Sequence, residues 1–305
     1  LTYDHIRSEK KAIRPDSLIL PDYAELEWPV PWYHGYDILR DEEVWIPAHA
    51  VFHPLPRIMG KLFRTSTNGI ASGNTLEEAI YHSLCELVER DAWSLVESSN
   101  NAGQVITEVD HPVARELMEK FERAGVEVIL RDITSDLGIP TVAAVSDDLQ
   151  LRDPTLLCIG MGSHLCSEIA VLRALTEVAQ SRATQIHGAR EDTQPTHFLS
   201  KVGYDRAKRL NKKWFTRDHE ISFKEMPSYH TDDFLDDIHI VLDRLKAAGL
   251  DRVIVSDLTR PEIGVPVVRV VVPGLELFAM DPERKGERCL RARRNYIPGA
   301  KPAGS

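Results

Sequence analysis

The stretch Ser83-Leu-Cys-Glu86-Leu-Val-Glu89-Arg90 decides how the 305-residue chain is interpreted. Its polar residues recur at intervals of three or four, and successive residues of an α-helix are about 100° apart, so the polar side chains share one helix face. The neighbouring residues that leave little of this helix free of hydrophobic contact are Ala79, Leu84, Leu87, Val88, Ala92 and Trp93. We therefore predict a packed helix that directs two carboxylates, a hydroxyl and a guanidinium to the same side.

A second stretch carries a similar polar stripe. Arg173, Glu177 and Gln180 share one face of another predicted helix, with apolar residues beside them. Ion pairs on a solvated helix would explain one such stripe, but the pattern occurs twice. If the two stripes face each other, their carboxylates repel unless a cation lies between them. A hard divalent cation such as Mg²⁺ suits these oxygen ligands and points to nucleotide chemistry.

Blocks of sequence recur in the same order along the chain. Glu86 and Glu177 are 91 residues apart, and the neighbouring alanines and leucines repeat at the same offset. The second repeated block runs through Ala124-Gly125, Asp132-Ile-Thr134, Gly138 and Pro140, and again through Ala248-Gly249, Asp257-Leu-Thr259, Gly264 and Pro266. We infer an internal duplication, with a polar insertion at residues 188–232.

The turn before the first striped helix is rich in small residues. Thr67-Asn68-Gly69 and the residues up to Thr75 allow close backbone approach to a ligand and supply a helix N-cap. Lys61 and Arg64 precede this turn and are candidates for holding phosphates. The usual nucleotide motifs are missing, because Gly60-Lys61 lacks the rest of a P-loop and Gly160-Met-Gly162 lacks the third glycine of a dinucleotide fingerprint.

Short hairpin signals outnumber alternating strand and helix signals, which predicts an α+β fold with helices on one side of largely antiparallel sheets. A duplicated unit of this kind places equivalent helices about a pseudo-two-fold axis. Residues 1–57, which are rich in proline and aromatic residues, are predicted to form an extended N-terminal segment that packs on a core domain of residues 58–305.

These motifs together resemble those of YcaO-domain proteins. The resemblance runs from about Gly60 to Arg288 and rests on Ser83-x-x-Glu86-x-x-Glu89-Arg90, on Glu177-x-x-Gln180-x-Arg182, on the Thr67 turn and on the late Pro273-Gly-Leu-Glu276, with Arg284, Gly286 and Arg288. It implies a YcaO-like fold and an enzyme that uses ATP and Mg²⁺ to activate a backbone amide of a peptide. In that family a nucleophile adds to the amide carbonyl, the oxyanion takes the γ-phosphoryl group of ATP, and phosphate leaves.

The resemblance also implies roles for individual residues. The catalytic and Mg²⁺-binding residues would be Glu86, Glu89, Glu177 and Gln180. The ATP-binding residues would be the cations Lys61, Arg90 and Arg182, which neutralise phosphate charge, and the hydroxyls Ser66, Thr67 and Ser83.

The product depends on the nucleophile. Azoline-forming cyclodehydratases of the family typically end in a proline-rich tail, whereas this chain ends Tyr296-Ile-Pro298-Gly-Ala-Lys-Pro302-Ala-Gly-Ser305. It is more similar to the compact thioamide-forming members, including the archaeal ones that install thioglycine in methyl-coenzyme M reductase and often work with a TfuA-type partner. The alternatives are an azoline-forming cyclodehydratase of a ribosomal peptide pathway and a nucleotide-binding scaffold without catalytic activity.

Composition limits the partners and the compartment. A formal net charge of −10 disfavours nonspecific binding to nucleic acid. The chain contains neither a long apolar run nor a signal-like N-terminus, so we expect a protein that is not in the membrane. Its four scattered cysteines indicate a reduced cytoplasmic protein without a disulfide framework. A homodimer is also compatible with the sequence.

Overall fold

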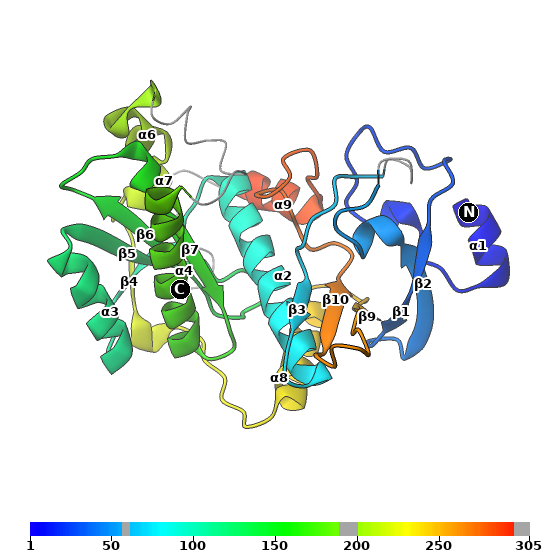
Figure 1. Cartoon of the computed structure of the whole chain (residues 1–305). Helices are drawn as coiled ribbons and strands as arrows, with labels where there is room; N and C mark the ends of the chain where they lie inside the picture. Colours follow the sequence, from blue (N-terminus) through cyan, green and yellow to red (C-terminus); the bar gives the residue numbers. More distant parts are fainter. Residues whose placement is uncertain (57–61, 189–200, 296–305) are drawn as a thin grey trace. The chain divides into compact units, whose positions relative to one another are not determined.

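The computed structural model describes residues 1–56, 62–188 and 201–295 (Figure 1). It contains two compact units, each with its own five-stranded sheet. The first unit comprises Leu1–Ser99 and Thr231–Ser305, and the second comprises Asn100–His230. The prediction of a mixed α and β fold with largely antiparallel sheets is confirmed.

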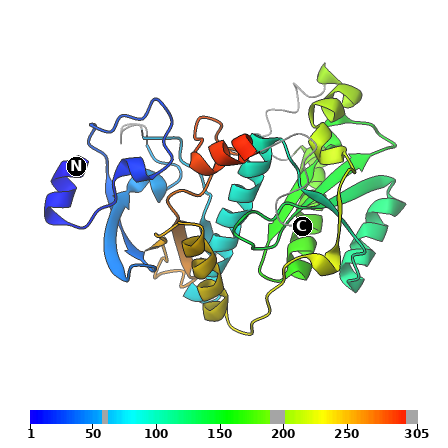
Figure 2. The ribbon, with the colours of Figure 1, turned by 180° about the vertical axis from the view of Figure 1, so that it is seen from behind.

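The sheet of the first unit has the order β2-β1-β9-β10-β3, and every neighbouring pair is antiparallel. Its strands are β1 (Trp32–Asp37), β2 (Glu42–Pro47), β3 (Ile70–Ser72), β9 (Ile254–Asp257) and β10 (Val267–Val271). Its helices are α1 (Tyr3–Glu9), α2 (Leu76–Ser99), α8 (Phe234–Ala247) and α9 (Glu287–Asn295), with short 3-10 turns at Pro15–Ser17 and Ala48–Ala50. Helix α2 packs on β3 and β10, and α8 lies beside α2 (Figure 2).

The N-terminal segment belongs to this sheet. Strand β1 pairs with β2 on one side and with β9 on the other. Trp45 of β2 also forms an isolated β-bridge with Ala12. A buried cluster that includes Ile13, Val44, Ile46 and Ile254 joins the segment to the later strands. The predicted domain boundary near residue 57 stays a prediction.

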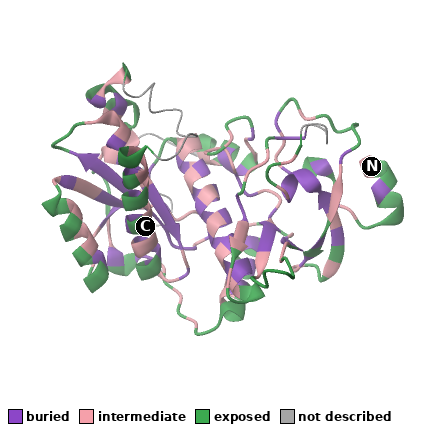
Figure 3. Cartoon of the chain, in the orientation of Figure 1, coloured by how far each residue is buried: buried purple, intermediate pink, exposed green. Residues whose placement is uncertain are grey.

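The sheet of the second unit has the order β7-β6-β5-β4-β8, and only the pair β4 and β8 is parallel among the described strands. Its strands are β4 (Gln104–Thr107), β5 (Val126–Asp132), β6 (Thr141–Asp148), β7 (Ile159–Ser163) and β8 (Glu220–Ser222). Its helices are α3 (Pro112–Arg123), α4 (Ser167–His187), α6 (Tyr204–Leu210) and α7 (Lys212–Phe215), with 3-10 turns at Pro154–Leu156 and Phe223–Glu225. Strand β6 is buried along its whole length, and α4 packs on β6 and β7 (Figure 3).

The two units contain equivalent elements, but the chain passes through these elements in a different order in each unit. In the second unit α3 leads to the antiparallel strands β5, β6 and β7, and β7 is followed by α4. In the first unit α8 leads to β9 and β10, and β10 pairs with β3, which is followed by α2. This correspondence supports the duplication inferred from the sequence.

The repeated sequence blocks form matching turns. The Thr134 N–H donates to Asp132 at 2.9 Å, and the Thr259 N–H donates to Asp257 at 2.8 Å. The threonine hydroxyl then accepts from the first residue of the next strand at 3.1 Å in both units. Gly138 and Gly264 both have positive φ, at 66° and 72°. The pseudo-two-fold axis itself stays a prediction.

Candidate active site

The turn before α2 is held by two of the predicted site residues. The Ser83 hydroxyl donates to the carbonyl oxygen of Gly69 at 2.7 Å, and the Gly69 N–H donates to Glu86 Oε2 at 3.1 Å. Gly69 has a φ of 84°, and a Cβ atom there would lie 2.5 Å from the carbonyl oxygen of Val270, so this position requires glycine. The backbone of the turn therefore orients the Glu86 carboxylate.

The first turn of α2 contains the carboxylate of Glu78, which was not among the site residues predicted from the sequence. The Glu78 N–H donates to the Thr75 hydroxyl at 3.2 Å, which confirms the predicted N-cap. The Asn74 N–H and side-chain amide donate to Glu78 Oε2 at 2.6 and 2.8 Å. The hydrogen bond from the Asn74 N–H lowers the pKa of Glu78. The spacing Asn74-Thr75-x-x-Glu78 resembles a capping box and was a signal that could have revealed this pair.

Glu89 and Arg90 form the far end of the polar face of α2. Glu89 is only 9% exposed, and its Oε1 lies 3.6 Å from Arg90 Nη2. The Arg90 guanidinium also lies over the Trp93 ring, 5.6 Å from its centre. A buried carboxylate and a partly restrained guanidinium thus occupy neighbouring positions.

Helix α4 of the second unit repeats the arrangement of Glu86. The Met161 N–H on strand β7 donates to Glu177 Oε2 at 3.0 Å. A Cβ atom at Gly160 would lie 2.1 Å from the Val178 nitrogen, and one at Gly162 would lie 2.4 Å from the Ala170 carbonyl oxygen. The incomplete fingerprint Gly160-x-Gly162 therefore allows a helix to approach a strand closely.

The remaining predicted site residues differ in their surroundings. Arg182 is 9% exposed, and its guanidinium donates to Asp148 at 2.9 Å and to the Leu156 carbonyl at 3.2 Å. These bonds and the buried hydroxyl bond of Ser83 are structural, and the ATP contacts of both residues stay predictions. Gln180 and Thr67 are exposed, and Ser66 is half-buried. Lys61 lies outside the described residues.

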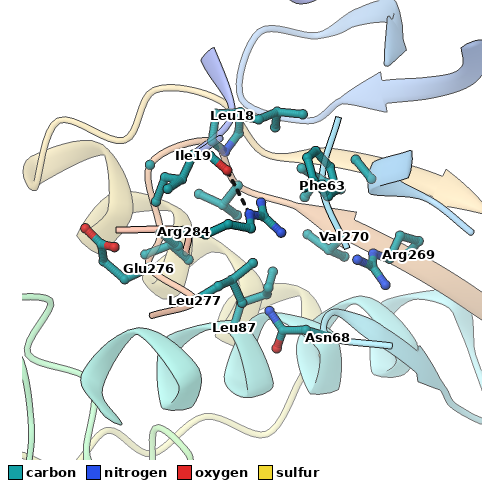
Figure 4. A pocket seen from close by; sticks show the side chains of 16 residues that line it. Leu18, Ile19, Phe63, Asn68, Leu87, Arg269, Val270, Glu276, Leu277 and Arg284 are labelled. Atoms are coloured by element: carbon teal, nitrogen blue, oxygen red, sulfur yellow. Dashed lines mark hydrogen bonds between the residues drawn. The ribbon is translucent and has the colours of Figure 1, made fainter. Parts of the chain in front are cut away.

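A cavity of about 50 Å³ lies in the first unit and contains residues that were given no role from the sequence (Figure 4). Its polar walls include Asn68, Arg269 and Arg284, which are 7%, 6% and 7% exposed. Burial lowers the pKa of both arginines to about 10. The Arg269 guanidinium donates to the Ser66 carbonyl oxygen at 2.8 Å, so the cavity adjoins the turn before α2.

Among these cavity residues, only Arg269 stands in a sequence pattern that could have marked it as a site residue. Arg269 is the single charged residue in the valine-rich strand Val267–Val271, and a charge in an apolar strand needs a specific reason. Arg284 belongs to the late motif that resembles the YcaO family, but no pattern in the adjacent sequence marks it as a site residue. Its guanidinium lies 4.0 Å from the centre of the Phe63 ring, and its Nε donates to the Ile19 carbonyl at 2.7 Å. These contacts depend on segments that are distant in sequence.

The donor chemistry of the α2 face suits Mg²⁺. Glu86 and Glu89 offer hard carboxylate oxygens one helical turn apart, and Glu86 is oriented by a backbone bond. Within the described residues, no group of three or more histidine, cysteine, aspartate or glutamate side chains could hold a metal ion by itself. Mg²⁺ commonly takes one or two carboxylates and completes its shell with phosphate oxygens and water.

Fold and site together define a class of α+β protein in which a helix after an edge strand presents backbone-oriented carboxylates. A family model described as YcaO cyclodehydratase, ATP- and Mg²⁺-binding, matches residues 1–276. The chain belongs to the YcaO family. The family recognised from the motifs is thus confirmed, and so is the expectation of a family of ATP- and Mg²⁺-using enzymes.

Individual relatives support this assignment. The chain is 52% identical to an uncharacterized protein of Methanothermobacter thermautotrophicus over 279 residues, which cover 90% of this chain and 73% of the relative. It is 35% identical to an uncharacterized protein in the tfuA 3' region of Rhizobium leguminosarum bv. trifolii, with coverage of 82% and 61%. The structure of YcaO from Methanopyrus kandleri bound with AMPPCP and Mg²⁺ matches with a TM-score of 0.78 and 32% identity, covering 91% of this chain and 71% of that one.

A membrane-spanning helix is not found in the part of the chain that the structure describes, because no helix there is both long and apolar enough.

Proposed function

We propose that the protein phosphorylates a backbone amide oxygen of a peptide with ATP and replaces that oxygen with sulfur from external sulfide. The observation that carries the proposal is the α2 face, where Glu86 is oriented by the Gly69 N–H beside the buried Glu89. Membership of an ATP- and Mg²⁺-binding family supports it. The similar structure of YcaO from Methanopyrus kandleri, which is bound with AMPPCP and Mg²⁺, supports ATP and Mg²⁺ as ligands of this chain.

The proposed residue roles follow from charge and hydrogen-bonding capacity. Glu86, Glu89, Glu177 and Gln180 would hold Mg²⁺, which would neutralise the charge that develops on the phosphates during transfer. Arg90, Lys61 and Arg182 would contact phosphate oxygens, and the hydroxyls of Ser66, Thr67 and Ser83 would complete the ATP site. Glu78, bonded to Asn74 at the start of α2, adds a further carboxylate to the same helix.

The reaction balances as a substitution at the amide carbon. Hydrosulfide adds to the carbonyl carbon, and the resulting oxyanion attacks the γ-phosphorus, so that ADP leaves. The C–O bond then breaks as the C=S bond forms, phosphate carries away the amide oxygen, and the sulfur proton is released. Phosphorylation is required because an amide oxygen is otherwise a poor leaving group, and the protein contributes alignment and charge neutralisation.

The proposed substrate is a glycine in methyl-coenzyme M reductase, which would become thioglycine, and the proposed partner is a TfuA-type protein that delivers sulfur. The similarity to a protein encoded in a tfuA 3' region supports this partner. The proposed location is the cytoplasm, because a reducing compartment keeps sulfide in its reduced form. A homodimer stays a prediction.

The test is the dependence of phosphate release on both cosubstrates. A glycine-containing peptide of methyl-coenzyme M reductase is incubated with the protein, ATP and Mg²⁺, with and without sulfide. The proposal predicts phosphate release only when peptide and sulfide are both present. Phosphate release with a cysteine-, serine- or threonine-containing peptide in the absence of sulfide, with loss of one water from the peptide, would identify an azoline-forming cyclodehydratase instead.

A further inference from the structure

Strand β3 forms one edge of the sheet in the first unit, and among the described strands it pairs only with β10 (Figure 1). Two hydrogen bonds show which of its backbone groups face β10. The Val270 N–H donates to the Gly69 carbonyl oxygen at 2.8 Å. The Gly73 N–H donates to the Pro266 carbonyl oxygen at 3.2 Å. Gly69 and Gly73 therefore both direct hydrogen-bonding groups to β10, as every second residue of an antiparallel strand does.

The alternate residues Ile70 and Ser72 direct their backbone groups to the open side of β3. The Ile70 N–H is already used in the turn, where it donates to the Thr67 carbonyl oxygen at 2.9 Å. Within the described part of the chain, the Ser72 N–H and the carbonyl oxygens of Ile70 and Ser72 make no hydrogen bond. One donor and two acceptors thus lie in a row along this side, and Ser72 is exposed.

The opposite edge of the same sheet is covered by the chain itself. The Trp45 N–H of β2 donates to the Lys11 carbonyl oxygen at 2.8 Å, and the Trp45 carbonyl oxygen accepts from the Ile13 N–H at 3.0 Å. Proteins commonly protect an edge with such a cover, or with charged residues or proline on the edge strand. The sequence of β3, Ile70-Ala-Ser72, contains neither a charge nor a proline. Its three residues are enough to pair with a short segment of another chain.

Strand β3 is held in place and leads directly to the candidate active site. It follows Gly69, whose N–H orients the Glu86 carboxylate. At its other end, a Cβ atom at Gly73 would lie 2.6 Å from the Ala79 nitrogen, so α2 packs closely on the strand. A segment paired with β3 would advance about 3.3 Å per residue. It would therefore reach the turn at Thr67, to which we assign ATP contacts, within a few residues.

The chemistry of the proposed function indicates what pairs with this edge. The reacting group is a backbone amide, and the proposed glycine has no side chain by which the protein could hold it. Pairing along a sheet edge binds an extended peptide through its own N–H and C=O groups. It also fixes the backbone in one orientation, which the transfer of a phosphoryl group to an amide oxygen requires.

We propose that the substrate peptide adds to this sheet as a strand beside β3. Two of its N–H groups, two residues apart, would donate to the carbonyl oxygens of Ile70 and Ser72. One of its carbonyl oxygens would accept from the Ser72 N–H. The reacting amide would follow the paired residues, on the side of Thr67. The inference rests on the proposed function and adds to it the site at which the peptide binds.

The first test uses the unaltered protein and changes only the peptide. A glycine-containing peptide of methyl-coenzyme M reductase is N-methylated at one residue at a time, leaving out the nitrogen of the reacting amide. Thioamide formation is measured against peptide concentration. Methylation at two positions separated by one residue should raise the KM for the peptide about fivefold or more, the effect of losing one hydrogen bond. Methylation of the residue between them should leave the KM unchanged, and a series without this alternation would overturn the inference.

The second test changes the protein. Ser72→Pro removes the outward N–H and keeps the hydrogen bonds between β3 and β10, and proline is tolerated at such a position of an edge strand. Glu43→Pro is the matched control, because Glu43 is exposed on the opposite edge and, like Trp45 two residues later, directs its N–H away from β1. Ser72→Pro should raise the KM for the peptide about fivefold or more, with the KM for ATP unchanged. Glu43→Pro should change neither.

The outcomes separate this inference from the proposed function. Thioamide formation with the same KM for the peptide in Ser72→Pro and Glu43→Pro would overturn the peptide site and leave the proposed function standing. The same result with loss of a dimer of Ser72→Pro in light scattering would assign the edge to a second copy of the chain, and would also overturn the peptide site. Azoline and no thioamide from the unmethylated peptides would overturn the proposed function and the inference that rests on it.

Discussion

At the scale of single residues, the two units use one device to orient a carboxylate. Glu86 accepts a hydrogen bond from Gly69, and Glu177 accepts one from Met161, in each case from the backbone at the edge of its own sheet. A charged side chain held by a backbone donor has fewer rotamers to lose when it binds a ligand. The glutamates that the sequence repeat relates thus accept the same kind of backbone hydrogen bond.

Glu86→Gln is the sharpest residue-scale test, because a glutamine oxygen can still accept the Gly69 hydrogen bond while the charge is lost. We expect peptide- and sulfide-dependent phosphate release to fall about 100-fold or more, with the melting temperature nearly unchanged. Glu77→Gln, at an exposed position on the same helix, is the matched control. Equal phosphate release in the two variants would refute the role of Glu86.

At the scale of elements, the position of Glu177 depends on the close contact between α4 and β7. Gly160 and Gly162 leave no room for a side chain at this contact, because a Cβ atom on either would overlap backbone atoms of the helix. Close packing transmits such an overlap into a shift of the whole element. The geometry of the Glu177 carboxylate is therefore set by two glycines on the neighbouring strand.

Gly160→Ala should move α4 away from β7. We expect a loss of about 1–3 kcal/mol in the free energy of unfolding, the usual cost of overpacking, and a loss of activity larger than the stability change explains. Chemical denaturation and phosphate release are the two measurements. Ala179→Ser, at an exposed position on α4, should leave both unchanged. Full activity and stability in Gly160→Ala would contradict the packing argument.

Helix α9 is attached to α2 by a buried ion pair. Arg288 donates to both oxygens of Asp91, at 2.9 and 2.8 Å, and the Glu276 N–H donates to Asp91 at 3.0 Å. Glu276 in turn accepts from the Gly286 and Cys289 N–H groups at 2.8 Å each. This network holds the segment that carries Arg284 against the cavity.

Asp91→Ala should leave the Arg288 charge buried without its carboxylate. The expected loss in the free energy of unfolding is about 3–5 kcal/mol, measured by urea denaturation. The double variant Asp91→Leu/Arg288→Met should be less destabilised than Asp91→Ala, because it removes both charges. A loss below about 1 kcal/mol in the single variant, the level of an exposed ion pair, would show that the pair is not the main attachment of α9.

At the scale of the whole molecule, the cysteines report on folding in both units. Burial raises the pKa of Cys158 to about 11 and also raises that of Cys289, so both thiols stay protonated at neutral pH. Cys85 is buried as well, and only Cys166 is half-buried. None of the three buried thiols has the exposure that a sulfur carrier needs.

Labelling with iodoacetamide at neutral pH should therefore modify Cys166 first. Cys85, Cys158 and Cys289 should react only after denaturant is added, and peptide mass mapping identifies the modified residue. Without denaturant the rate at Cys158 should stay low well above neutral pH, because burial both raises the pKa of this thiol to about 11 and excludes the reagent. Rapid labelling of Cys158 in the native protein at neutral pH would be inconsistent with its burial.

Sequence reasoning reached the parts of the protein that short-range pattern determines. The polar face of α2, its N-cap at Thr75 and the paired turns at Asp132 and Asp257 depend on nearby residues, and the structure contains all of them. The cavity could not be predicted in this way, since tertiary packing brings its walls together from Leu18 to Arg284. The close packing of α4 on Gly160 and Gly162 of β7 could not be predicted either, because this contact forms only in the folded unit.

The measurement that tests the central claim most directly follows the amide oxygen. A glycine-containing peptide of methyl-coenzyme M reductase, labelled with oxygen-18 at the glycine carbonyl, is incubated with the protein, ATP, Mg²⁺ and sulfide. Mass spectrometry then compares the peptide and the released phosphate. We predict that the labelled peptide gains the mass difference between sulfur-32 and oxygen-18 and that the phosphate carries the label. Unlabelled phosphate, or a peptide that keeps its labelled oxygen while ATP is consumed, would contradict amide phosphorylation.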